Sequence, residues 1–425
     1  MTEKISASYL LLRGWLGRLA AIGSSTFVLT VLFLMLFDVG LREIQPLRYL
    51  NHTGLTTIHQ NSLVSKLPVA LADPRQADVL LMGSSLMLFP CVRCDDEYHG
   101  VKTRYDRWYM RNHLFEYNKA EYLEHLLSNR LGQKVQISNV SVAAAMISDQ
   151  YLILKKYLAS GKRPKLIVLT VAPRDFLDNQ RAEVEKTPTY SILADFTCLS
   201  DLLSHHPSYQ ELATFSLGSV STLYKNRADY NKFWTNLTST LTAHPTTLYT
   251  AQMKNDVKGN LELVEGEESV LGFARPDYGP KKNALAELDN YKTIYLPINE
   301  KCFQTQSEYL SKLLALAKED RVPVLIVQMP LTGANIELLP IRARQRYSDT
   351  LAQSAARYGA KLCSPGDAQQ YGLDDFEDCA HLNSQGGKKL FNCLVSELAG
   401  DRRMAQTLTS AGTRVGFFPK WTLFF

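Results

Sequence analysis

The stretch DFEDCAHLNSQGGKKLF, residues 375–391, places acidic side chains and an imidazole within a few positions of one another. Asp378 lies three residues before His381, just ahead of a segment with helical spacing. A carboxylate at this spacing can hold a neutral imidazole in the tautomer that accepts a proton from a nucleophile. Asp375 and Glu377 are competing acids if the turn is wide, and an ordinary turn without chemistry is the alternative. If the chemical interpretation is right, a nucleophile lies elsewhere in the chain.

The sequence Gly83-Ser84-Ser85 supplies a hydroxyl nucleophile, because it ends the apolar run ADVLLM. A serine hydroxyl is a poor nucleophile until a neighbouring base removes its proton. A Gly-Ser-Ser loop alone, or a histidine alone, is common and predicts little. Together, Ser85, His381 and Asp378 provide the nucleophile, the base and the orienting acid of a catalytic triad.

Alternating strands and helices position these residues. Five apolar runs are expected to be strands, at residues 77–85, 133–140, 164–173, 322–330 and 360–365. Segments with helical spacing separate them, and the helix after the second run is expected to begin at a Ser148 or Asp149 cap. This order predicts an α/β fold with a five-stranded parallel sheet covered on both faces. Chemistry in such sheets collects at the carboxyl ends of the strands.

Polar side chains follow four of these strands. Gly83-Ser84-Ser85 ends the first strand, Asn139 and Ser141 end the second, and Arg174 and Asp175 end the third. The segment with Asp378 and His381 follows the fifth strand. All four groups are expected at one edge of the sheet, where the ends of parallel strands meet.

The N-terminal region predicts a membrane anchor. No charged residue occurs between Leu19 and Phe37, and this span is about long enough to cross a bilayer as one helix. Lys4, Arg13 and Arg18 precede the span, which favours a cytoplasmic N-terminus and an extracytoplasmic main domain. Two arginines beyond the span weaken this bias. A cleaved signal peptide fits poorly, because DVGLREIQ rather than a run of small residues follows.

The expected organisation has five parts. They are a cytoplasmic N-terminus and transmembrane anchor at 1–44, a first part of the catalytic domain at 45–177, a mostly helical insertion or lid at 178–295, a second part of the catalytic domain at 296–400, and an apolar C-terminal tail at 401–425. The net charge of +5 forms no long basic run, so no nucleic-acid partner is expected. Seven cysteines without zinc-ligand spacing suggest neither a metal nor a cofactor.

The motifs GSS, NVSVAAA and DxxHLN resemble the blocks of the SGNH/GDSL hydrolase superfamily. That resemblance implies a flavodoxin-like three-layer sandwich, and it favours Ser85 over Ser84 because the nucleophile stands last in its triplet. The segments VAPRDFLDN, YLPIN and VQMPLTGANIELLP are similar to those of membrane-anchored SGNH-like bacterial proteins of the cyanobacterial type. The architecture is also similar to that of DltD-like partners of membrane-bound O-acyltransferases.

The chain departs from the superfamily pattern at two positions that normally help to form the oxyanion hole. Ala144 stands where the second block has glycine, and Arg174 stands where the third block has asparagine. A backbone amide at Ala144 can still donate if its dihedral angles allow it, and an arginine can also donate to an oxyanion. Alternatively, Arg174 pairs with Asp175 or binds an anionic substrate. Asn139 and Ser141 are further oxyanion or substrate-binding candidates.

The expected function is an extracytoplasmic acyl-transfer enzyme or esterase that adds acyl groups to a cell-surface polysaccharide or removes them. The expected partners are an acyl-glycan or ester substrate, membrane lipid and a membrane-bound O-acyltransferase. The alternative is a degenerate SGNH-like domain that binds glycan or serves as a scaffold for such an acyltransferase.

Overall fold

The computed structural model describes a large part of the chain. The described residues are 26–44, 64, 66–102, 113–114, 116–205, 207–225, 227, 230–231, 234, 238, 285, 287–366 and 371–410. They fall into two compact units, which are treated separately below. The unit that contains the sheet comprises the described residues of 59–194 and 258–425, and the smaller unit comprises those of 1–58 and 195–257.

A five-stranded sheet is the centre of the larger unit. Its strands are β1 (Val79–Met82), β2 (Ile137–Asn139), β3 (Leu166–Val171), β4 (Val324–Gln328) and β5 (Lys361–Cys363). They are all parallel and lie in the order β2-β1-β3-β4-β5. Every residue of β1 and β3 is buried, and so is every residue of β4 except the last. This burial explains the continuous apolar sequences of the three strands. The predicted α/β fold with a five-stranded parallel sheet is confirmed.

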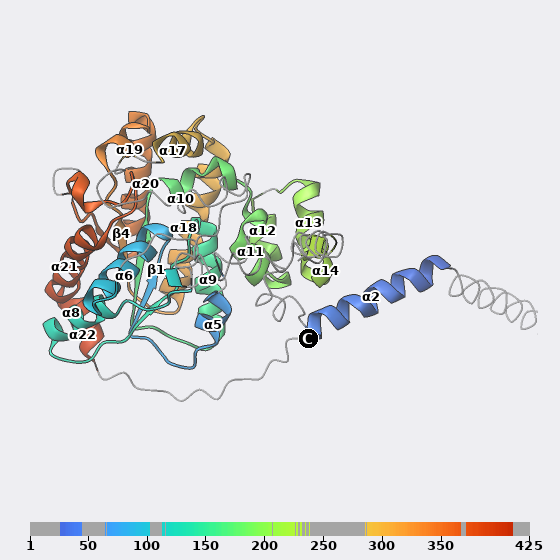
Figure 1. Cartoon of the computed structure of the whole chain (residues 1–425), viewed down its shortest axis with the longest axis horizontal. Helices are drawn as coiled ribbons and strands as arrows, with labels where there is room; N and C mark the ends of the chain where they lie inside the picture. The colour runs from blue at the N-terminus through green and yellow to red at the C-terminus, as the bar shows by residue number, and fades with distance from the viewer. Residues whose placement is uncertain are drawn as a thin grey trace, which may run out of the picture. The chain divides into compact units, whose positions relative to one another are not determined.

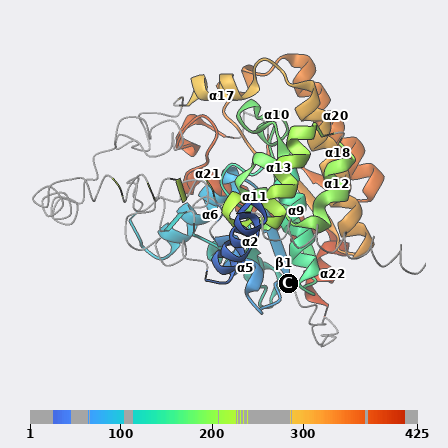
Figure 2. The same ribbon diagram turned by 90° about the vertical axis from the view of Figure 1, so that its right-hand side faces the viewer.

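The helices of this unit connect the strands and extend beyond them. They are α5 (Lys66–Ala72), α6 (Ser85–Tyr98), α8 (Glu121–Leu131), α9 (Ile147–Ala159), α10 (Arg174–Leu177), α11 (Pro188–Leu193), α17 (Leu288–Tyr295), α18 (Glu300–Glu319), α19 (Gly333–Glu337), α20 (Ile341–Tyr358), α21 (Ser384–Gly400) and α22 (Arg402–Thr409). Short 3-10 turns are η2 (Asn179–Arg181), η3 (Val184–Lys186) and η5 (Leu373–Asp375). α6, α8 and α21 pack together, as do α9, α18 and α20. Figures 1 and 2 show these two groups on different sides of the strands.

One predicted helix start is wrong. α9 begins at Ile147, with Met146 as its N-cap, rather than at Ser148 or Asp149. Asp149 is the third helical residue, and its Oδ2 accepts a hydrogen bond from the Met146 N–H at 2.8 Å. The side chain therefore serves the helix start from inside the first turn, as the acid of a capping box does.

The smaller unit contains α2 (Thr26–Ile44), η4 (Phe196–Cys198), α12 (Leu199–Leu203), α13 (Tyr209–Val220) and α14 (Thr222–Lys225). In α2 the buried Asp38 carboxylate accepts hydrogen bonds from the Ser221 hydroxyl at 2.8 Å and from the Thr222 N–H at 2.9 Å. Asp38 thus caps the N-terminus of α14. Its carboxylate accepts backbone amides that have no partner within the helix.

No helix among the described residues is both long and apolar enough to cross a membrane. The first seven positions of the predicted span, 19–25, lie outside the described residues. So do the last fifteen residues of the predicted apolar tail and the stretch 239–284 of the predicted insertion. The anchor and the domain boundaries stay predictions.

Candidate active site

A sharp turn between β1 and α6 positions Ser85. β1 ends at Met82, and Ser85 is the first residue of α6. The hydroxyl of Thr170, on the neighbouring strand β3, donates to the Met82 carbonyl at 2.9 Å. A Cβ atom at Gly83 would lie 2.0 Å from Thr170 Oγ1, so only glycine fits here. The turn therefore brings Ser85 to the carboxyl end of the sheet, at the start of a helix.

Asp378 and His381 lie in a tight hairpin, residues 376–382. An antiparallel bridge joins its two ends, and the Glu377 N–H donates to the His381 carbonyl at 2.8 Å. Asp378 Oδ1 accepts the N–H groups of Ala380 and His381, both at 2.8 Å. This local pattern is how aspartate side chains stabilise short turns. It holds one carboxylate oxygen on the backbone and leaves the other, Oδ2, for the imidazole.

The three residues predicted as a triad form a continuous hydrogen-bonded chain. Asp378 Oδ2 lies 2.7 Å from His381 Nδ1, and His381 Nε2 lies 2.9 Å from Ser85 Oγ. A carboxylate only accepts, so Nδ1 carries the proton and Nε2 is free to accept from the serine hydroxyl. All three side chains are buried, with residue exposures of 3% or less. The predicted contacts are therefore present, and the catalytic roles stay predictions.

The charge state of Asp378 suits this geometry. Burial opposes ionisation of its carboxyl, but attraction to His381 and hydrogen bonds from His381 and Ala380 outweigh that effect. The pKa of Asp378 therefore lies below its ordinary value. An ionised Asp378 stabilises the imidazolium that forms when His381 takes a proton.

The two competing acids of the same stretch have other partners. Asp375 Oδ2 accepts from Lys389 Nζ at 2.7 Å and from the Gly372 N–H at 2.8 Å. Glu377 forms a buried ion pair with Arg93, with Nη2 and Oε2 3.1 Å apart. Asp378 is thus the acid on the imidazole, and its neighbours stabilise the segment that carries it.

One face of α6 supports His381. The Phe89 ring lies 4.3 Å from the His381 ring, centroid to centroid, and the Arg93 guanidinium carbon lies 5.6 Å from the Phe89 ring. Ser85, Phe89 and Arg93 are four residues apart, which places them on one face of a helix. Sequence reasoning missed Phe89 and Arg93, although this spacing from Ser85 was a usable signal.

A second set of contacts fixes the tip of the hairpin beside Asp378. Thr332, the N-cap of α19, donates its hydroxyl to the Cys379 carbonyl at 2.8 Å. Asn335 Nδ2 lies 3.4 Å from Cys379 Sγ, and the Tyr295 hydroxyl donates to Asn335 Oδ1 at 3.0 Å. These residues belong to the segments YLPIN and VQMPLTGANIELLP, which the resemblance singled out without assigning them a role.

Of the two candidates at the end of β2, Asn139 uses its side chain for structural contacts. Asn139 Oδ1 accepts the Ser141 N–H at 3.0 Å, and Asn139 Nδ2 donates to the Lys119 carbonyl at 3.0 Å. Both ends of the Asn139 amide are therefore used to shape the loop. Among the described residues, the buried Ser141 hydroxyl has no hydrogen-bond partner.

Ala144 has the backbone conformation of a glycine. Its φ angle is +63°, in the left-handed region, and it is the third residue of a turn closed by the Ala145 N–H on the Val142 carbonyl at 3.3 Å. The Val142 N–H donates to the Gly83 carbonyl at 3.1 Å, which places this turn beside the β1–α6 turn. Arg181 Nη1 donates to the Ala144 carbonyl at 3.1 Å. Sequence reasoning missed Arg181, which lies in the segment predicted as insertion.

Arg174 lies within ion-pair distance of the expected acid, Asp175, and it also donates a hydrogen bond to a second acid, Asp178. Its Nη2 donates to Asp178 at 2.6 Å, whereas its Nη1 lies 3.9 Å from Asp175 Oδ1. Arg174 Nη1 and Asp175 Oδ1 are both buried, and neither has a hydrogen-bond partner among the described residues. The Asp175 Oδ2 atom accepts the Ala172 N–H at 2.9 Å.

The Asp175 carboxyl links this group to the nucleophile turn through Ser84. Burial raises the pKa of Asp175 to about 7, against the opposing effects of Arg174 and of hydrogen bonds from Ala172 and Ser84. Asp175 is fully buried and follows β3, next to β1 in the sheet. Its protonation therefore changes the charge beside the turn that holds Ser85.

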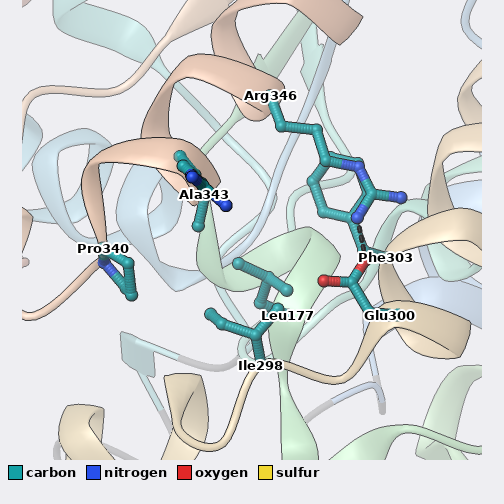
Figure 3. Close-up of a pocket in the computed structure, with 8 residues that line it drawn as sticks. Leu177, Ile298, Glu300, Phe303, Pro340, Ala343 and Arg346 are labelled. Carbon is teal, nitrogen blue, oxygen red and sulfur yellow. Dashed lines mark hydrogen bonds and ion pairs between the residues drawn. The ribbon is translucent and has the colours of Figure 1, made fainter.

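A small pocket lies elsewhere in this unit. It has a volume of about 150 Å³ between α10 and the starts of α18 and α20. Figure 3 shows an apolar lining with the ion pair of Arg346 and Glu300 at one side. Its lining residues are Leu177, Ile298, Glu300, Phe303, Pro340, Arg342, Ala343 and Arg346. None of them is a predicted site residue, so this pocket is separate from the triad.

The side chains around Ser85 define the chemistry that is available there. No three metal-ligating side chains converge at the triad within the described residues. All seven cysteines are free thiols, including Cys91 and Cys94 on α6. Around Ser85 the chain therefore presents a hydroxyl, an imidazole, carboxylates and guanidinium groups, and the arrangement can carry a proton from Ser85 through His381.

Comparison with known proteins shows the family of this chain. No curated protein sequence matches it. Residues 27–398 match the family described as "protein of unknown function (DUF1574)", a range that includes Ser85, Asp378 and His381. The match spans most of the chain, and the protein is a member of the DUF1574 family.

Proposed function

We propose that this protein is a membrane-anchored, extracytoplasmic SGNH-type acyl-transfer enzyme that acts on ester-linked acyl groups of a cell-surface polysaccharide. The observation that carries the proposal is the hydrogen-bonded chain from Asp378 through His381 to Ser85. A lone histidine or serine would carry no such proposal. An aligned acid, base and hydroxyl is the arrangement that activates serine on unrelated folds.

Each residue of the chain has a defined task. Ser85 Oγ attacks the carbonyl carbon of an ester while His381 Nε2 takes its proton. The resulting imidazolium is stabilised by ionised Asp378, and it returns the proton to the leaving alkoxide. Water in an esterase, or a sugar hydroxyl in a transferase, then attacks the acyl-serine while His381 takes its proton, and His381 returns that proton to Ser85 Oγ as the acyl group leaves. The buried setting of all three residues favours a small acyl group of the acetyl type.

Three donors are candidates for the oxyanion hole. The Ser85 N–H belongs to the first helical residue of α6, and such amides have no partner within the helix. The Ala144 N–H lies in the left-handed turn beside it. Arg174 Nη1 is a buried donor that has no hydrogen-bond partner among the described residues, although Asp175 Oδ1 lies 3.9 Å away. A buried guanidinium that replaces the usual asparagine amide adds positive charge where the oxyanion forms.

The strand order supports the superfamily assignment. The order 2-1-3-4-5, all parallel, is that of flavodoxin-like doubly wound sheets. Helix groups on different sides of the strands fit the three-layer sandwich that the resemblance implies.

The proposed location rests on the N-terminal region. The large apolar side chains of α2 between Leu29 and Phe37 are all exposed, so this part of the helix is apolar around its circumference, ahead of Asp38, Arg42 and Glu43. Such a helix is suited to lipid rather than to water. With Lys4 and Arg13 before the span, we propose a single pass with the N-terminus inside. Added protease should digest the large domain on intact spheroplasts, and full protection of that domain would reverse the topology.

An aryl acetate tests the reaction. We expect the purified full-length protein to release one equivalent of the phenol in a fast phase, as the acyl-serine forms, followed by slower turnover. An acceptor glycan should speed the slow phase if the protein is a transferase and leave it unchanged if it is an esterase. Ser85→Ala should remove the fast phase. A wild type that behaves like Ser85→Ala would refute the proposed activity.

A second candidate function is a degenerate SGNH-like domain that binds glycan or serves as a scaffold for a membrane-bound O-acyltransferase. The replacement of the usual glycine and asparagine by Ala144 and Arg174 favours it. It predicts that Ser85→Ala supports polysaccharide acylation in cells as well as the wild type does. The enzymatic function predicts that acylation is lost in the same cells.

A further inference from the structure

The left-handed conformation of Ala144 requires something to hold it. Residues with a Cβ atom pay roughly 1–2 kcal/mol in this region, and glycine is the usual occupant. Ala144 is third in the turn that the Ala145 N–H closes on the Val142 carbonyl. An alanine at that place in an ordinary turn takes a negative φ instead, which rotates the preceding peptide by about half a turn. The direction of the Ala144 N–H therefore depends on which of the two forms the turn adopts.

Contacts at three points restrain this turn. At its start, the Val142 N–H donates to the Gly83 carbonyl at 3.1 Å. Just beyond its end, the Met146 N–H donates to the buried Asp149 carboxylate at 2.8 Å. Between them, Arg181 Nη1 donates to the Ala144 carbonyl at 3.1 Å. Arg181 makes the contact with the strained residue itself, and it reaches the turn from η2, beyond α10.

Arg181 keeps its charge in this position. Burial and the nearby positive charge of Arg174 lower the pKa of Arg181 to about 10, which still leaves it protonated at neutral pH. A charged donor makes a stronger hydrogen bond to a carbonyl than a neutral one does. The charged hydrogen bond from Arg181 to the Ala144 carbonyl can therefore offset part of the backbone strain at Ala144.

We propose that Arg181 is a positioning residue that holds Ala144 in the left-handed conformation and so keeps the Ala144 N–H directed at the oxyanion site beside Ser85. This inference rests on the proposed acyl-transfer function, because it assigns the turn a role in that reaction. It also explains how the chain retains a glycine-type turn without the glycine. Arg181 acts through Ala144 and does not contact the reacting atoms.

The decisive experiment compares Arg181→Gln in two backgrounds, with Ala144 and with Ala144→Gly. The probe is a fluorophosphonate, and the measured quantity is its rate of reaction with Ser85 in the full-length protein. With Ala144 present, we expect Arg181→Gln to slow the reaction about tenfold, because the turn relaxes to the form that alanine prefers. With glycine at 144 the left-handed form carries no strain, so the same substitution should slow the reaction less than about threefold. Aryl acetate turnover should show a lower kcat with little change in KM.

Arg163→Gln is the matched control. Arg163 Nη1 also donates to a backbone carbonyl, that of Leu158 at 2.7 Å. This contact lies near the beginning of β3, whereas Ser85 lies at the opposite, carboxyl edge of the sheet. This variant should react at the wild-type rate. Arg181→Lys, which keeps a charged donor, should recover part of the lost rate. Equal effects of Arg181→Gln in the two backgrounds, or wild-type reactivity of Arg181→Gln, would overturn the proposal.

Hydrogen exchange separates failure of this inference from failure of the proposed function. Arg181→Gln should speed amide exchange in the peptide that contains residues 142–147, and Ala144→Gly should restore slow exchange. A wild type that does not react with the probe refutes the acyl-transfer function. In that case unchanged exchange in Arg181→Gln also refutes the role of Arg181 in the turn, whereas faster exchange upholds that role.

Discussion

The buried ion pair behind the histidine allows a quantitative prediction about stability. Arg93 and Glu377 are 1% and 4% exposed, and they lie between the α6 face and the hairpin that carries His381. Replacing Arg93 by Met keeps most of the volume but leaves the Glu377 carboxylate buried without its cation. Breaking a buried pair in this way costs about 3–5 kcal/mol, because the remaining charge has lost its solvation and its partner. We expect a loss of that size in the free energy of unfolding.

The double variant Arg93→Met/Glu377→Leu removes both charges together. Replacing a buried ion pair by apolar side chains is often neutral or stabilising, so we expect the double variant to recover most of the loss. The coupling energy between the two positions should therefore be several kcal/mol, well above the level expected for independent sites. The assay is urea denaturation followed by circular dichroism at constant pH and ionic strength.

The surface pair of Arg75 and Asp73 is the control. Its Nη2 and Oδ2 atoms are 2.6 Å apart, but the Arg75 side chain is 73% exposed. Exposed ion pairs contribute about 0–1 kcal/mol, so Arg75→Met should have little effect on unfolding. If Arg93→Met lowers the free energy of unfolding no more than Arg75→Met does, or if the double variant loses as much as the single one, the ion pair does not stabilise the hairpin.

Three further predictions concern the site. Gly83→Ala should destabilise the protein by about 1–3 kcal/mol, because its Cβ would lie 2.0 Å from Thr170 Oγ1, and Thr170→Ala should relieve much of this in urea denaturation. Asp175 has a raised pKa of about 7, so the folded protein binds this proton more tightly, and the contribution of Asp175 to stability falls as pH rises from about 4 to 7. In thermal unfolding Asp175→Asn should remove that fall, and identical pH profiles of the wild type and the variant would contradict the raised pKa. Asp378→Asn should slow acylation of Ser85 by about 10⁴-fold with a near-normal fold, and a loss below tenfold would show that Asp378 does not orient His381.

Much of the scaffold could be predicted because its signals are local. The five strands are short apolar runs between helical segments, and β1, β3 and β4 lie within the runs expected from sequence. Their parallel order brings Ser85 and His381 together although 296 positions separate them. Hydrophobic periodicity and the rules for strand connections are sufficient to predict this meeting of Ser85 and His381, because the carboxyl ends of parallel strands lie at one edge of the sheet.

The support of the site could not be predicted in the same way. Whether Asp375, Glu377 or Asp378 faces the imidazole depends on turn geometry, and three acids in four residues carry no local signal that separates them. The role of Arg181 depends on a contact across 37 positions with a backbone carbonyl, which has no side-chain signature. Arg174 lies within ion-pair distance of Asp175, but its hydrogen bond goes to Asp178, the residue that follows α10, because side chains four apart are neighbours on a helix.

A fluorophosphonate probe reports whether Ser85 is an activated nucleophile. Wild type, Ser84→Ala and Ser85→Ala should be treated in parallel, and the modified peptide should be identified by mass spectrometry. We expect a single adduct on Ser85 in the wild type, an adduct at the same residue in Ser84→Ala, and none in Ser85→Ala. Equal labelling of the wild type and Ser85→Ala, or no labelling of the wild type, would contradict the role of Ser85 as the nucleophile.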